Sequence, residues 1–364
     1  MRSIRQNSSI WKACKFFIIS GLTVILTSLL FAIPIAATSE STLIRLSQTT
    51  AFEQESTNDL IANLLYQKPD RSYRAMAISG AIGVNAAWEN NQFQQWYIEA
   101  QRAGERAIIG GLINNNEAAI TAGFKIFDWG FARQAADGSF TGTGDPFHST
   151  SMFLQAVSHA LLMIQQSPQS QKYATQVTHY KPIVNRAAHW MITPQVWNNG
   201  MRKNEALTHR FYLVGAALGL TGKLTDDREL IDYARQSIEK GLSRQRSDGV
   251  NPEKGGHDSN YQMAGVMFVA RWITYFPNDS LTPRVIQMIN KALIWEETRI
   301  LPSGEISSEG NTRTAGQERR RNGQIKKVDR WTAIWGFAYW ASVTGENKWE
   351  AIARKIAQYY YSGL

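Results

Sequence analysis

The sequence predicts an all-α fold, an (α/α) toroid built from repeated helical hairpins, and three observations lead to this prediction. From residue 76 onward, apolar residues recur at helical spacing almost everywhere, as in residues 153–164 and 331–343. Glycine-containing turns punctuate the chain with a period of about 55 residues. No stretch stands out for the alternation of polar and apolar residues that is typical of β-strands.

The turns that define the repeat are Asp137–Gly138, Asn199–Gly200, Asp248–Gly249 and Ser303–Gly304. They are separated by 62, 49 and 55 residues. Each turn is followed by a polar stretch and then by a helix rich in alanine, glycine and aromatic residues. That second helix is apolar nearly all round, so we expect it to line the inside of a closed ring. The helix before each turn keeps a charged face, as residues 228–242 show, and is expected outside.

The N-terminal residues 1–37 are predicted to be a signal peptide or a membrane anchor. A basic start precedes the apolar residues 16–37, which end in Ala36–Ala37, as in a secretory signal. The apolar run is also long enough to span a bilayer if it is not cleaved. Either alternative predicts export, to a periplasmic, extracellular or membrane-anchored location. Residues 38–75 are expected to form a linker and a first helix near 56–67, and residues 76–364 the toroid.

The positive charge of the chain is concentrated in one segment. The formal net charge is +9, and residues 310–330 contain seven cations and two acids. Such a segment is either a solvated loop or a patch for an anionic polymer. For an exported protein, the polymer is expected to be an acidic polysaccharide rather than nucleic acid. The candidate binding residues in and beside this loop are Arg319, Arg320, Arg321, Arg330 and Trp331.

The loops that enter the inner helices of a toroid gather on one rim, so distant residues meet there. Three of the six histidines begin predicted inner helices at equivalent positions of the repeat. The candidate residues at these positions are Asp145, His148, Asn204, His209, Arg210, Lys254, His257, Asp258 and Tyr261. Asp258 is interpreted either as a catalytic group or as the N-cap of its helix. The spacing of the histidines does not match HxH or HExxH, so no metal and no cofactor is expected.

Side chains of these types suit β-elimination on a uronic acid. The reaction removes the proton at C5 and expels the oxygen at C4, and it has three requirements. A cation or an amide must neutralise the carboxylate, a base such as histidine must take the proton, and an acid such as tyrosine must protonate the leaving oxygen. Nearby cations are expected to lower the pKa of Tyr261.

Two segments, residues 204–220 and 254–267, resemble the (α/α)-toroid polysaccharide lyases, especially the alginate-lyase-like ones. Those enzymes carry an Asn and a His near the start of one inner helix. A Tyr follows roughly fifty residues later, with a basic residue shortly before it. The resemblance implies that His209 is the base or the carboxylate neutraliser, that Asn204 neutralises the carboxylate, and that Tyr261 is base and acid. Lys254 stands where the family has its basic residue.

Two other function classes stay open from the sequence. A toroid glycoside hydrolase needs two carboxylates that flank the scissile bond. Its candidates are Asp128, Asp145, Glu205 and Asp258. A non-catalytic, exported protein that binds acidic polysaccharide would keep the aromatic residues and the basic loop but would not need His209 or Tyr261. In each case a monomer is expected.

Overall fold

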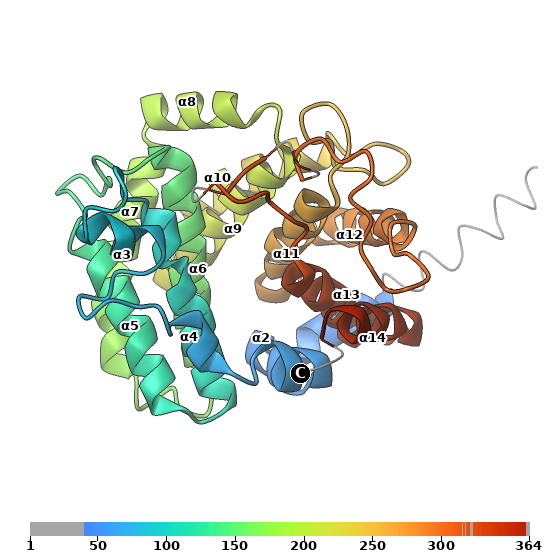
Figure 1. The fold of residues 1–364 in the computed structure, drawn as a ribbon, viewed down its shortest axis with the longest axis horizontal. Coiled ribbons are helices and arrows are strands. Elements are labelled where there is room, and N and C mark those ends of the chain that lie inside the picture. The colour runs from blue at the N-terminus through green and yellow to red at the C-terminus, as the bar shows by residue number, and fades with distance from the viewer. Residues whose placement is uncertain (1–39, 315, 317, 321–322, 362–364) are drawn as a thin grey trace, which may run out of the picture.

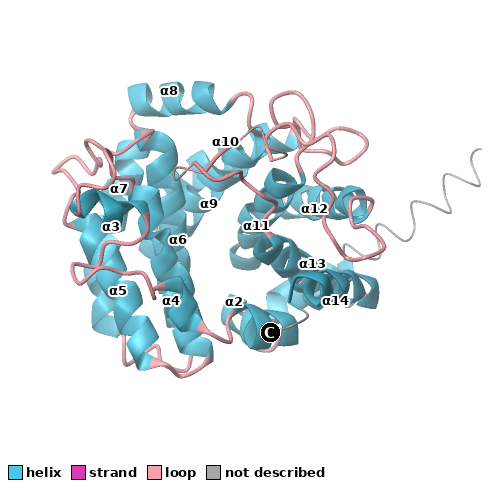
Figure 2. Ribbon diagram, viewed as in Figure 1, coloured by secondary structure: helices cyan, strands magenta, loops and turns pink. Residues whose placement is uncertain are grey.

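The computed structural model describes residues 40–314, 316, 318–320 and 323–361. Over these residues the chain is all-helical and contains no β-strand, only isolated bridges (Figure 2). Residues 40–48 are helical. The helices that follow are α2 (Ala51–Ser56), η1 (Leu60–Leu65), η2 (Pro69–Ser72), α3 (Val84–Glu89), η3 (Ile98–Arg102), α4 (Ala103–Ile113), α5 (Glu117–Phe131), α6 (Pro146–Gln166), α7 (Ala174–Ile192), α8 (Pro194–Asn204), α9 (Thr208–Thr225), α10 (Arg228–Leu242), α11 (Ser259–Tyr275), α12 (Thr282–Glu297), α13 (Arg330–Thr344) and α14 (Asn347–Tyr361). The all-α prediction is therefore confirmed.

The helices form two layers. In the inner layer, α4, α6, α9, α11 and α13 pack side by side in that order, and α2 contacts both α13 and α6. Each inner helix packs against the outer helix that follows it, which gives the pairs α4–α5, α6–α7, α9–α10, α11–α12 and α13–α14. Figure 1 shows the inner helices around a common centre, with α5, α7, α12 and α14 at the periphery. The inner helices α9 and α13 bury residues on every face, whereas α10 buries one stripe, because only an outer helix faces water on one side.

Four turns share one geometry that only glycine accommodates. In each turn the glycine has φ between 93° and 101°, and a Cβ atom would lie 2.2–2.4 Å from a backbone carbonyl oxygen of an outer helix. The glycines are Gly80, Gly138, Gly249 and Gly304, and the carbonyl oxygens belong to Lys125, Arg186, Lys291 and Lys355. The turns at Gly138, Gly249 and Gly304 are three of the four that the sequence predicts, and the turn at Gly80 was missed.

The predicted turn at Asn199–Gly200 is wrong, because both residues lie inside α8. Pro194 starts this helix at a first-turn position where its missing N–H costs nothing. Gly200 allows the ring of Phe147 to pack directly against α8, since an added Cβ would lie 2.4 Å from that ring. The helix α8 thus takes the place of one turn between the outer helix α7 and the inner helix α9 (Figure 1).

Three predictions concern the N-terminal part of the chain. The segment 1–37, predicted to be a signal or an anchor, lies outside the described residues. None of the helices in the described part of the chain is both long and apolar enough to cross a membrane. The helix expected near residues 56–67 corresponds to the short helix η1. The linker expected before it is wrong, because residues 40–48 are helical and α2, capped by Thr50, follows them.

Candidate active site

The structure brings His209 and Tyr261 together at the start of two neighbouring inner helices. His209 is the second residue of α9 and Tyr261 the third of α11, and these two helices pack side by side. The ring centroids are 4.4 Å apart and the ring planes are tilted by 38°. Both side chains are largely buried, so each needs polar partners from the protein.

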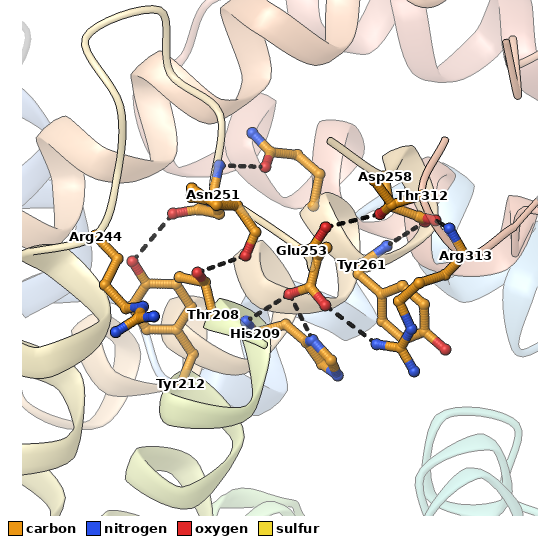
Figure 3. Close-up of polar contacts among 12 residues, drawn as sticks. Thr208, His209, Tyr212, Arg244, Asn251, Glu253, Asp258, Tyr261, Thr312 and Arg313 are labelled. Carbon is orange, nitrogen blue, oxygen red and sulfur yellow. Dashed lines mark hydrogen bonds and ion pairs between the residues drawn. The ribbon is translucent and has the colours of Figure 1, made fainter. Parts of the chain in front are cut away.

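Glu253 holds His209 in place (Figure 3). One carboxylate oxygen of Glu253 lies 2.7 Å from Nδ1 of His209 and accepts the backbone N–H of the same residue at 3.0 Å. Burial lowers the pKa of His209, although the Glu253 carboxylate opposes that effect. A neutral imidazole that donates Nδ1–H to a carboxylate keeps a lone pair on Nε2. His209 is thus arranged as a base whose ring orientation is set by Glu253.

Arg313 covers the ring of Tyr261 and links two carboxylates. Its guanidinium carbon lies 3.5 Å from the centroid of the Tyr261 ring, a cation–π contact. Its Nη1 is 3.1 Å from Glu253 and its Nη2 is 3.1 Å from Glu318. Figure 3 shows Glu253 between His209 and Arg313. The chain at Arg313 is fixed by Asp258, whose carboxylate accepts the backbone N–H of Arg313 at 2.9 Å.

Asp258 is the N-cap of α11, which is one of its two predicted roles. Its side chain accepts the backbone N–H of Tyr261 at 3.3 Å. It also accepts the backbone N–H of Thr314 at 2.7 Å and the hydroxyl of Thr314 at 3.0 Å. A carboxylate with this many fixed donors serves as an anchor for the loop and has little capacity left for proton transfer.

The hydroxyl of Tyr261 lies between an anion and a cation. It donates to Glu318 at 2.7 Å and accepts a short hydrogen bond from the Lys326 ammonium. The sequence suggests that nearby cations lower the pKa of Tyr261, but the structure gives the opposite net direction. Burial raises the pKa of Tyr261, Arg313 opposes it, and the hydrogen bond to Glu318 raises it further. Tyr261 is therefore a neutral proton donor.

Three further candidates lie where α6 and α9 begin. Arg210 Nη1 is 3.3 Å from the carboxylate of Asp145, which ties the two helix starts together. His148 Nε2 is 3.8 Å from the carboxylate of Glu99. Burial lowers the pKa of His148, and the positive charge of Arg210 adds to that effect. In this part of the rim, Arg210 is thus paired with Asp145, and a largely neutral imidazole lies beside the carboxylate of Glu99.

The remaining predicted catalytic residues are placed differently. Lys254 has a backbone φ of 50°, and its side chain is exposed. The cations that contact Tyr261 are Arg313 and Lys326, whereas the resemblance placed Lys254 in the position of the family's basic residue. His257 lies against the Trp295 ring and contacts the Glu309 carbonyl oxygen at 3.2 Å, so it steadies the loop. Asn204 is buried at the end of α8.

The basic loop presents several of its cations to solvent. Arg319 and Arg320 are exposed, whereas Arg321 lies outside the described residues. The Arg330 guanidinium carbon lies 5.1 Å from the centroid of the Tyr361 ring. Trp331 is covered by the Arg106 guanidinium, 3.9 Å from the ring centroid, at the adjoining starts of α4 and α13.

The carboxylates expected for a glycoside hydrolase have other partners. Glu205 forms ion pairs with Lys240 at 3.0 Å and with Arg244 at 2.6 Å. Asp128 accepts a hydrogen bond from the Tyr180 hydroxyl in the outer layer. Asp145 pairs with Arg210, and Asp258 caps α11, so each of these four carboxylates has a partner within the protein.

We call six side chains the rim cluster: His209, Glu253, Tyr261, Arg313, Glu318 and Lys326. Four of its members were not predicted as site residues: Glu253, Arg313, Glu318 and Lys326. Glu253 carries a signal in the sequence, because it directly precedes the polar loop that leads to Tyr261. Arg313, Glu318 and Lys326 belong to the segment 310–330, where the sequence does not distinguish them from the other charged residues.

Within the described part of the chain, no three His, Cys, Asp or Glu side chains are grouped so that they could hold a metal ion. Comparisons with protein-family models, with curated proteins and with solved structures give no match for this chain. The chemistry of the rim cluster is therefore inferred from its own geometry.

Proposed function

We propose that this protein is an exported polysaccharide lyase that cleaves a uronate-containing acidic polysaccharide by β-elimination. The observation that carries the proposal is the contact between His209 and Tyr261, a carboxylate-held imidazole beside a neutral phenol, with ring centroids 4.4 Å apart. A base and an acid at this separation suit a reaction that removes one proton and delivers another on the same sugar unit.

The proposed reaction uses four side chains in three roles. Nε2 of His209 takes the proton from C5, and the electron pair of the C5–H bond forms the C4–C5 double bond. The C4–O4 bond breaks, and the Tyr261 hydroxyl protonates the leaving oxygen. Arg313 and Lys326 neutralise the carboxylate of the uronate, which makes the C5 proton more acidic. This assigns base and acid to two residues, where the resemblance allowed Tyr261 to be both.

The proposed fold for this activity is the (α/α) toroid. Two observations support it: the order of contacts α4–α6–α9–α11–α13, and the contacts of α2 with both α13 and α6. Export is supported by the basic start and the apolar run of residues 1–37. The exposed arginines Arg319 and Arg320 suit the proposed acidic substrate.

An assay with a panel of uronate polymers tests the proposal. A lyase gives products that absorb in the far ultraviolet, because the new C4–C5 double bond is conjugated to the carboxylate. Reducing ends released without that absorbance would identify a hydrolase instead. Binding of the polymers without either signal would identify a non-catalytic binding protein, and both of these results would overturn the proposed lyase activity.

A further inference from the structure

The carboxylate of Glu318 contacts three donor side chains of the rim cluster. Its Oε2 accepts the Tyr261 hydroxyl at 2.7 Å, and its Oε1 lies 3.1 Å from Arg313 Nη2 and 3.8 Å from Lys326 Nζ. The two oxygens of one planar carboxylate thus face separate donors. Arginine and lysine donors of this kind are the usual partners of a carboxylate.

The two carboxylates of the rim cluster differ in how firmly they are held. Glu253 has a side chain that is 0% exposed and is bonded to the backbone and the ring of His209. Glu318 has a side chain that is 30% exposed. Its bonds within the cluster go only to the three groups that the proposed reaction assigns to the substrate. Glu318 is therefore the carboxylate that can exchange with an external one.

Charge balance restricts what can replace Glu318. Arg313 and Lys326 contribute two positive charges to the rim cluster, and Glu253 and Glu318 contribute two negative charges. The side chain of Arg313 is only 8% exposed, so loss of Glu318 without a replacement would leave two cations facing the single carboxylate of Glu253 in a poorly solvated place. A ligand with one carboxylate restores the balance, whereas a neutral sugar does not.

We infer that Glu318 occupies the position of the substrate carboxylate, and that a uronate unit binds by exchanging its own carboxylate for that of Glu318. This inference rests on the proposed function and names the feature of the substrate that the rim cluster recognises. After the exchange, Arg313 and Lys326 form their ion pairs with the uronate carboxylate. It also releases the Tyr261 hydroxyl from Glu318, so that the hydroxyl becomes free to protonate O4. Glu318 thereby makes the site selective for carboxylate-bearing sugars.

The test compares Glu318→Gln with the control Glu305→Gln, an equal change of charge at an exposed residue before the basic loop. Binding of short oligouronates of defined type is measured by titration calorimetry, with neutral oligosaccharides of the same length as a second probe. We expect Glu318→Gln to bind oligouronates about tenfold more tightly, because a weaker internal competitor is displaced. Glu305→Gln is expected to bind like the wild type, and neutral oligosaccharides are expected to show no difference among the variants.

The outcomes separate the inference from the proposed function. If the wild type binds and cleaves an oligouronate but Glu318→Gln binds it equally or more weakly, Glu318 is a permanent partner of Tyr261 and the inference alone fails. If neither protein binds or cleaves any oligouronate, the proposed function fails and the inference with it. Tighter binding of neutral oligosaccharides by Glu318→Gln would also overturn the inference, because the gain would not depend on a carboxylate.

Discussion

His209 and Tyr261 are 52 residues apart in the sequence, yet their ring centroids lie 4.4 Å apart. Each sits in the first turn of an inner helix, and α9 and α11 are neighbours. Glu253 orients the first ring, whereas Glu318 and Lys326 hold the hydroxyl of the second. The protein's own side chains thus hold the two rings next to each other, which positions the proposed base and acid.

Substitution Tyr261→Phe removes the proposed acid and keeps the ring. We expect the kcat on the substrate polymer to fall by at least about 100-fold, the lower range for loss of a general acid. KM is expected to change little, because the ring still packs against Arg313 and His209. The measurement is the rate of far-ultraviolet absorbance, with Tyr360→Phe on α14 as the control. A wild-type rate in Tyr261→Phe would contradict the assignment.

Substitution Glu253→Ala removes the acceptor of the backbone N–H and the ring of His209, and it leaves Arg313 paired with Glu318 but not with Glu253. The free energy of unfolding is expected to fall by about 3–5 kcal/mol, since removing one member of a buried ion pair is strongly destabilising. Urea unfolding measures the change. Glu229→Ala, at the exposed start of α10, should change the value by less than about 0.5 kcal/mol. Equal losses in both variants would show that Glu253 does not hold the loop.

The shared turns can be tested with two glycines that both have positive φ. Gly249 has φ 93° and a Cβ would lie 2.2 Å from the Lys291 carbonyl oxygen, whereas Gly255 has φ 85° and open space around it. Gly255→Ala is expected to lower the free energy of unfolding by about 1–2 kcal/mol, which is the backbone strain alone. Gly249→Ala should lower the free energy of unfolding by clearly more, because α12 must shift as well. Equal unfolding free energies of the two variants would rule out the close approach at Gly249.

Glu55 should make the stability depend on pH near neutrality. It lies on α2, and burial raises its pKa from 4.5 to about 7, with Arg271 opposing and Glu105 adding to the effect. Below pH 4.5 the carboxyl is protonated in both the folded and the unfolded chain. Between pH 4.5 and 7 only the unfolded chain ionises, so the free energy of unfolding falls with rising pH by about 3 kcal/mol in total.

The variant Glu55→Gln cannot ionise and should lose this contribution to the pH dependence. Urea unfolding between pH 4 and pH 8 is the measurement, with Glu229→Gln as a control at an exposed position. We expect the difference in the free energy of unfolding between the wild type and Glu55→Gln to change between pH 4.5 and about 7 and to level off above that range. A constant difference at every pH would mean that Glu55 ionises in the folded protein as it does in water.

The exposed arginines of the basic loop should contribute affinity rather than chemistry. Replacing Arg319 and Arg320 by alanine is expected to weaken polymer binding at low salt and to have less effect at high salt, where exposed charges are screened. Binding titrations at several salt concentrations measure this, and kcat is expected to stay unchanged. Equal affinity of variant and wild type at low salt would show that these arginines do not face the polymer.

The sequence by itself determined the helical class, the shared start positions of His209 and Tyr261, and three of the four glycine turns. These features follow from local rules: apolar periodicity, and a backbone conformation with positive φ that glycine adopts readily. The same rules misplaced the turn at Asn199–Gly200, because glycine also occurs within helices where a ring packs closely, as Phe147 does here.

Only the tertiary structure decided which charges meet the two aromatic rings. Arg313, Glu318 and Lys326 come from a loop more than fifty residues after Tyr261, and no local pattern separates them from the exposed arginines beside them. Asp258 fixes the start of this loop, because its carboxylate accepts the backbone N–H groups of Arg313 and Thr314. The side chains then pair with each other, because buried charges require partners. The tertiary structure also decided that the pKa of Tyr261 is raised, because the burial that outweighs the effect of the nearby cations exists only in the folded chain.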